Sequence, residues 1–177
     1  MWFRTVELKG GHTVSAARAV LQTGEADYAW NIQAEPGVIG DLEATGKGEM
    51  AYVFKPLMER IYINFSDPNK EVNGETSQKD TPHPFLLEKP VREAISLAID
   101  RETITEQLYG EAGNVATNFT VSPEKYVSPN TEYEFDLEKA ATLLDDAGWL
   151  DTNGDGVRDK KGVEMTLLFS SSVNPVR

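Results

Sequence analysis

Residues 151–159, DTNGDGVRD, combine side chains whose types and spacing could hold a metal ion. Asp151, Asn153 and Asp155 stand at alternate positions, and Gly156 follows them. Calcium loops of the EF-hand type place oxygen ligands at such alternate positions and use a glycine for the sharp bend. The stretch therefore fits the opening half of a calcium site.

The residues after this stretch depart from the calcium pattern. The twelfth position, which needs a bidentate glutamate, is Gly162, and the nearest acid, Glu164, comes two residues late. An EF-hand also needs an exit helix, whereas residues 163–170 alternate as a strand does. We therefore predict a polar turn in which Gly154 and Gly156 adopt positive φ and the Asp and Asn side chains bond their own backbone. A calcium-dependent interaction module remains the alternative.

Other chemically active residues lack the spacing of a site. The chain has no cysteine, so it has no thiolate ligand, disulfide or cysteine nucleophile. His12 and His83 stand far apart in predicted loops, and we expect both at the surface. The sequence contains neither a nucleophile elbow nor a phosphate-binding glycine loop. Nucleophilic catalysis and phosphate binding are therefore unsupported.

The composition is that of an acidic globular chain. Its 177 residues are 40% hydrophobic, enough for a buried core, and its net charge is −12. This charge opposes binding to nucleic acid or anionic lipid. No apolar run approaches the roughly 20 residues of a membrane span, and the first residues lack the apolar stretch of a secretion signal. Either the protein is made without a signal, or the chain is a piece of a longer one.

The elements that must position any site begin with an alternation of strands and helices. Thr13 and Gly24 are placed to begin and end one helix, and Pro36 and Gly46 do the same for the next. Residues 3–8, 26–32 and 49–56 read as strands. This β-α-β-α-β order predicts an α/β layer with helices packed on a sheet.

A second region follows from about residue 58. Ile61, Ile63 and Phe65 share one face of a predicted strand, and a long polar loop comes after it. Helices are predicted from Pro90, from Asp100 to Gly110 and from Asp136 to Gly148, with a last strand at residues 163–170. Arg92 and Arg101 flank the first of these helices, and we expect them to form helix-terminal and surface ion pairs.

Trp30 and Asn31 end the predicted strand at residues 26–32. Ligands of α/β sheets bind outside the carboxyl ends of strands, where an aromatic face and an amide are useful. The same pair is equally consistent with a core tryptophan and an asparagine that turns the chain. The residue pattern leaves both interpretations open.

Three longer motifs make the chain similar to a known family. They are LQTGEADYAWNI, HPFLLEKPVREAISLAIDRETITEQLYG and FDLEKAATLLDDAGWLDTNGDGVRDKKG. With these motifs in this order, the chain closely resembles the bacterial extracytoplasmic solute-binding proteins of family 5, the dipeptide and oligopeptide type. The resemblance covers nearly the whole chain.

The resemblance implies a fold that neither composition nor periodicity reveals. It implies part of a periplasmic-binding-protein type II fold, an α/β architecture with a mixed sheet and flanking helices. By this mapping the chain is an internal fragment that spans pieces of two lobes. Residues 1–57 resemble the end of the first lobe, and residues 58–177 resemble the beginning of the second. The crossing near residues 61–64 would lie at the hinge.

The resemblance also implies a function without chemistry and without a cofactor. The chain would belong to the receptor of an ABC importer, which holds a peptide or another small solute between closing lobes and delivers it to the permease subunits. Trp30 and Asn31 match the place where family members line the cleft, and Tyr62 and Asn64 are further ligand-binding candidates. The receptor would work in the periplasm or at the outer face of the bacterial membrane. It would contact the membrane only through the permease or a lipid anchor absent from this chain.

Overall fold

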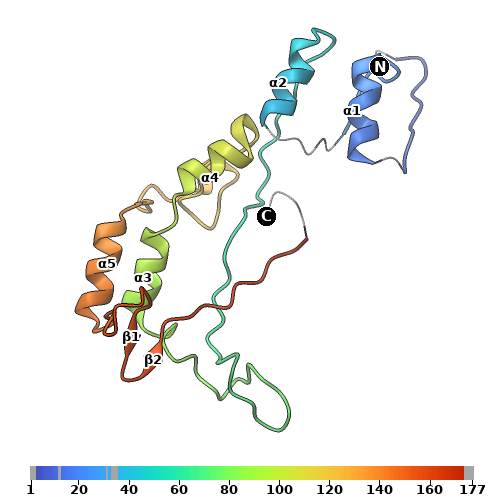
Figure 1. Ribbon diagram of the computed structural model, residues 1–177. Coiled ribbons are helices and arrows are strands. Elements are labelled where there is room, and N and C mark those ends of the chain that lie inside the picture. The colour runs from blue at the N-terminus through green and yellow to red at the C-terminus, as the bar shows by residue number, and fades with distance from the viewer. Residues whose placement is uncertain (1–2, 12, 31, 33–35, 174–177) are drawn as a thin grey trace. The chain divides into compact units, whose positions relative to one another are not determined.

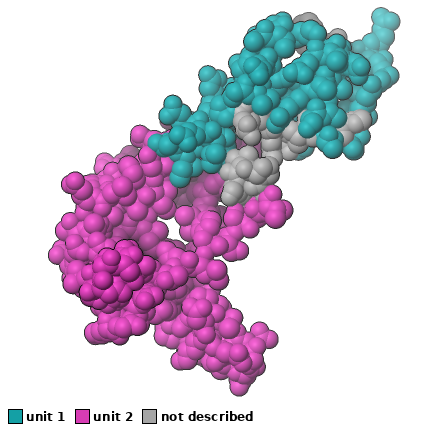
Figure 2. All heavy atoms as spheres, in the orientation of Figure 1, with its two compact units in different colours: residues 1–54, 103–114 teal, residues 55–102, 115–177 magenta. Residues whose placement is uncertain are grey.

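The computed structural model describes residues 3–11, 13–30, 32 and 36–173. The chain divides into two compact units, residues 1–54 with 103–114 and residues 55–102 with 115–177 (Figure 2). The assignment of residues 1–57 and 58–177 to two lobes stays a prediction.

The first unit contains two helices that end where the sequence predicts. Helix α1 spans Val14–Thr23, its Thr13 side chain accepts a hydrogen bond from the first turn, and Gly24 closes it in the left-handed conformation at φ 78°. Helix α2 spans Pro36–Ala44 and buries two apolar side chains. Gly46 follows at φ 64°. Both helix predictions are confirmed, because capping and helical periodicity act within a few residues.

The strands predicted in the first unit are wrong for the described structure. In residues 3–8, 26–32 and 49–56, no described residue belongs to a strand. Val6, Leu8 and Val53 are 70%, 92% and 74% exposed. An alternating pattern sets the two faces of a strand, but a strand also needs a neighbouring chain to take up its backbone hydrogen bonds.

The second unit is built on the helix pair α3 and α5. Helix α3 spans Lys89–Leu97 and helix α5 spans Leu137–Asp146, and the two lie side by side (Figure 1). The Asp136 carboxylate accepts a hydrogen bond of 2.8 Å from the Lys139 amide, which confirms it as the cap of α5. In the sequence, α3 and α5 are separated by α4, Arg101–Leu108, and by two short 3-10 helices, η1 at Gly110–Ala112 and η2 at Glu124–Tyr126. Helix α4 begins in this unit and continues into the first.

Trp149 is the centre of the larger core cluster. It is 1% exposed, and its ring meets that of Phe85 edge to face at 5.5 Å. Its indole nitrogen donates to the Glu88 carboxylate at 3.2 Å, and Lys160 donates to the same group at 2.8 Å. The hydrogen bond from Lys160 is the main reason why the pKa of Glu88 lies below its usual value. This contact joins the start of α3 to the segment that follows α5.

A small hairpin follows the predicted turn. Strand β1, Asp159–Lys160, pairs antiparallel with β2, Val163–Glu164. Lys161 and Gly162 connect them with φ values of 54° and 79°, as a type I′ turn requires. The strand predicted at residues 163–170 is therefore correct only at its start: the Met165 amide still donates to the Arg158 carbonyl at 2.7 Å, but no described residue beyond Glu164 belongs to a strand. The glycine that occupies the twelfth calcium position thus serves a hairpin.

Candidate ligand-binding site

Residues 59–66 present two of the predicted ligand-binding residues in the second unit. The strand predicted here is wrong for the described structure, since Ser66 forms only an isolated bridge with Pro82. The His83 amide donates to the Phe65 carbonyl at 2.7 Å. The end of the segment is therefore fixed to the loop that precedes α3, while its earlier residues have no partner strand among the described residues.

The alternation of this segment nevertheless sets which side chains reach the core. Ile63 packs against the cluster around Trp149. Successive side chains of an extended chain point to opposite sides, so Tyr62 and Asn64 belong to the side away from Ile63. Tyr62 is 77% exposed. The structure thus brings Tyr62 and Asn64 to one accessible face.

Arg60 adds a cationic group to this face. Its guanidinium lies 4.9 Å from the ring centroid of Tyr62 and 5.5 Å from that of Phe119. Both rings are 77% exposed. No pattern in the sequence predicts this grouping, because Phe119 lies in a distant loop and aromatic residues in loops have no diagnostic spacing. We call Arg60, Tyr62 and Phe119 the arginine–aromatic cluster.

Asn64 makes a local turn that fixes its side chain. Its carbonyl oxygen Oδ1 accepts hydrogen bonds from the Ser66 amide at 3.0 Å and the Ser66 hydroxyl at 2.8 Å. No acceptor among the described residues takes a hydrogen bond from its Nδ2 group. The side chain is therefore oriented, and its amide nitrogen can still donate to a ligand.

Trp30 and Asn31 belong to the first unit. Trp30 is 69% exposed, so the core interpretation of this residue does not hold in the described structure. Asn31 lies outside the described residues. The structure joins Tyr62 and Asn64 in one unit, and the ligand-binding role of all four residues stays a prediction.

His83 is not the surface residue that we expected. It is 7% exposed, and its Nδ1 atom accepts hydrogen bonds from the amides of Leu86 at 3.2 Å and Phe85 at 3.4 Å. Burial lowers the pKa of His83, and the nearby Asp67 carboxylate opposes that shift. The expectation failed because the predicted loop folds back into the core. His12 lies outside the described residues.

Arg92 and Arg101 hold loops, and neither forms the expected ion pair with a residue that the structure describes. Arg92 donates to the Leu86 carbonyl at 2.9 Å. Arg101 donates to the Ala116 carbonyl at 3.1 Å, and its guanidinium lies 4.7 Å from the Tyr133 ring centroid. Arg101 also donates to the Ser96 hydroxyl at 3.0 Å, so both arginines fasten backbone or side chains near their helices.

Residues 151–159 form the predicted polar turn. Gly154 and Gly156 adopt φ values of 80° and 87°. The Asp151 carboxylate accepts hydrogen bonds from the amides of Gly154 at 2.7 Å and Gly156 at 3.0 Å. Asn153 and Asp155 each accept from an amide two residues later. The side chains that suggested calcium ligands are used to fold the turn.

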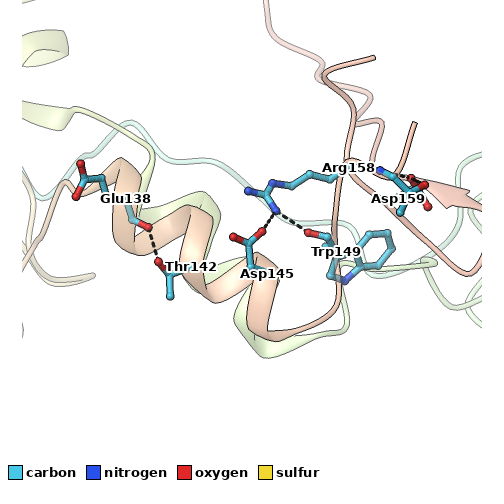
Figure 3. Close-up of polar contacts among 7 residues, drawn as sticks. Glu138, Thr142, Asp145, Trp149, Arg158 and Asp159 are labelled. Carbon is cyan, nitrogen blue, oxygen red and sulfur yellow. Dashed lines mark hydrogen bonds and ion pairs between the residues drawn. The ribbon is translucent and has the colours of Figure 1, made fainter. Parts of the chain in front are cut away.

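Side chains at the end of the turn fasten it to α5. Arg158 pairs with Asp145 of α5 and donates to the Trp149 carbonyl at 2.6 Å (Figure 3). Asp159 accepts a 2.5 Å hydrogen bond from the Thr152 hydroxyl. Among the described residues, no group of three His, Cys, Asp or Glu side chains is arranged to hold a metal ion. The calcium alternative thus gains no support.

The described helices also include none that is long and apolar enough to cross a membrane.

Comparison with known proteins identifies the chain's relatives. Residues 2–177 match the family described as bacterial extracellular solute-binding proteins, family 5 Middle. The oligopeptide-binding protein AppA of Bacillus subtilis is 30% identical over 98% of this chain and 29% of its own length. A Brucella ovis protein with the provisional name of an ABC transporter peptide-binding protein is 37% identical over 54% of this chain and 16% of its own length. No solved structure matches.

These relatives are much longer than the matched chain. The oligopeptide-binding protein OppA of Lactococcus lactis is 28% identical over 64% of this chain, which is 19% of OppA. The chain thus spans less than a third of the relatives that it matches. The family match, in contrast, runs through almost every residue of both units. This chain belongs to the bacterial extracellular solute-binding proteins of family 5 and corresponds to their middle part.

Proposed function

We propose that this chain forms the middle part of an extracytoplasmic receptor that binds peptides and delivers them to the permease subunits of an ABC importer. The observation that carries the proposal is the similarity to AppA along 98% of the chain, since AppA is named as an oligopeptide-binding protein. The receptor acts in the periplasm or at the outer face of the cell membrane. It contacts the membrane through the permease or a lipid anchor.

Binding occurs between two lobes of a type II periplasmic-binding fold. Residues 1–57 contribute to the first lobe and residues 58–177 to the second, with the hinge near residues 61–64. The exposed Trp30 and Tyr62 rings supply apolar contact, and the amides of Asn31 and Asn64 supply hydrogen bonds to the peptide backbone. Closure follows from the higher affinity of the ligand for the closed form. No covalent step and no cofactor is needed.

Peptide binding is tested with protein purified from the complete gene. A ligand that binds only the folded protein at 100 times its Kd raises the free energy of unfolding by about 2.7 kcal/mol. We expect such a thermal shift with some members of a peptide panel and none with free amino acids or sugars. No shift with any peptide would refute the proposal.

The site is tested by Tyr62→Ala, with Tyr126→Ala as its matched control. Both rings are largely exposed, at 77% and 65%, so neither substitution should unfold the protein. We expect Tyr62→Ala to weaken peptide binding and Tyr126→Ala to leave it unchanged. Equal effects of the two substitutions would remove Tyr62 from the site and leave the peptide-binding function standing.

A further inference from the structure

Arg60 has a charged group that the described structure does not neutralise. Glu88, Glu134 and Asp145 each pair with a Lys or Arg side chain. For Arg60, no hydrogen bond or ion pair exists with any residue that the structure describes. Its guanidinium lies over the rings of Tyr62 and Phe119. A guanidinium in this position remains charged and keeps its N–H donors available.

The two rings hold the guanidinium without using its hydrogen bonds. A cation is attracted to the face of an aromatic ring within about 6 Å, and both distances, 4.9 and 5.5 Å, satisfy this condition. Ring contacts engage the flat faces of a guanidinium, whereas its donors lie in the plane and match a carboxylate in a two-pronged arrangement. The cluster thus orients an edge of the guanidinium whose N–H groups can donate hydrogen bonds to an anion.

The cluster also lies beside the predicted ligand-binding residues. Arg60, Tyr62 and Asn64 alternate along one segment, and Ile63 between them packs into the core. Any ligand that contacts Tyr62 and Asn64 therefore comes within reach of Arg60. The chain has a net charge of −12, so this cationic group differs in sign from the protein's overall charge.

We propose that Arg60, held by Tyr62 and Phe119, selects ligands that carry a carboxylate at the position facing this cluster. The inference rests on the proposed peptide-binding function and adds a ligand class to it. The carboxylate comes either from an acidic side chain or from the carboxyl end of the peptide. Both sources present the same planar group to the guanidinium.

The test compares two pools of pentapeptides that are neutral except for one position, where one pool has Glu and the other Gln. Binding to protein made from the complete gene is measured with wild type, Arg60→Gln and Arg60→Lys. We expect Arg60→Gln to lower the affinity for the preferred carboxylate ligand about fivefold, which is the upper range for a solvent-accessible ion pair. Arg60→Lys keeps the charge but loses the planar fork, so it should give an intermediate affinity.

Further arms identify the carboxylate and control for net charge. Loss of affinity for the Glu pool alone assigns a side-chain carboxylate. Loss for both free-acid pools but not for C-terminally amidated copies assigns the carboxyl end. Lys79→Gln, an exposed loop substitution of equal charge, should change neither affinity.

Two outcomes would overturn the inference, and they are distinguishable. If wild type binds the pools and Arg60→Gln weakens neither by more than Lys79→Gln does, Arg60 does not select carboxylates and the peptide-binding function stands. If wild type binds neither pool nor any other peptide, the proposed function fails and the inference fails with it. A melting temperature of Arg60→Gln equal to that of wild type confirms that the variant is folded.

Discussion

Replacing Trp149 by Phe tests how the second unit is held together. The indole of Trp149 is 1% exposed and donates a 3.2 Å hydrogen bond to the Glu88 carboxylate. Hydrogen bonds to charged groups contribute about 1.5–3 kcal/mol, and the lower end applies because Glu88 is partly exposed. The smaller ring also leaves a cavity that costs about 1–2 kcal/mol. We therefore expect the substitution to lower the free energy of unfolding by about 3 kcal/mol.

Urea unfolding followed by circular dichroism measures this loss, and the same substitution at Trp30 is the control. Trp30 is 69% exposed, so Trp30→Phe should change the free energy of unfolding by less than about 0.5 kcal/mol. A double-mutant cycle with Glu88→Ala should return a coupling of about 1.5 kcal/mol for the hydrogen bond. If Trp149→Phe costs no more than Trp30→Phe, the described core is wrong.

Three further predictions concern pH, the hairpin and calcium. Burial lowers the pKa of His83, so the unfolded chain binds a proton at a higher pH than the folded chain does. The free energy of unfolding should therefore fall as the pH drops below about 6.5. In His83→Gln, the urea midpoint should depend less on pH in this range. Gly162→Ala should cost about 1–2 kcal/mol in the same assay because φ is 79°, whereas Gly48→Ala, without positive φ, should not. Millimolar calcium should leave the melting temperature unchanged, since the Asp151 carboxylate already accepts two amide hydrogen bonds. A rise that a chelator reverses would contradict this.

Local signals in the sequence predicted the helices and the turn. Thr13, Asp136 and Gly24 act on amides or carbonyls within a few residues, so their roles are readable without the rest of the fold. The turn at residues 151–159 likewise consists of side chains bonded to nearby backbone. These elements need no distant partner, which is why the predictions hold.

Distant contacts account for what the sequence did not predict. The Glu88 carboxylate accepts hydrogen bonds from Trp149 and Lys160, which are distant in the sequence. Arg60 likewise contacts Phe119, which is distant in the sequence. The predicted strands failed for a related reason, since alternation at residues 49–56 specifies faces but no pairing partner. Large apolar side chains in these unpaired segments, such as Val53 at 74%, are exposed.

The candidate site also combines residues that local sequence patterns indicate with residues that only the structure brings together. Tyr62 and Asn64 came from the family resemblance, and the alternation around Ile63 explains why both side chains lie away from the core. The contact between Arg60 and Phe119 could be found only in the structure, because residue spacing in the sequence does not predict an arginine near two rings.

Peptide binding by the purified protein from the complete gene is the most direct test of the proposed function. Titration calorimetry with the pentapeptide pools should show saturable binding at one site per protein, weakened by Tyr62→Ala and unchanged by Tyr126→Ala. Absence of heat and of thermal stabilisation with every pool, from a protein that unfolds cooperatively, would contradict the assignment as a peptide receptor.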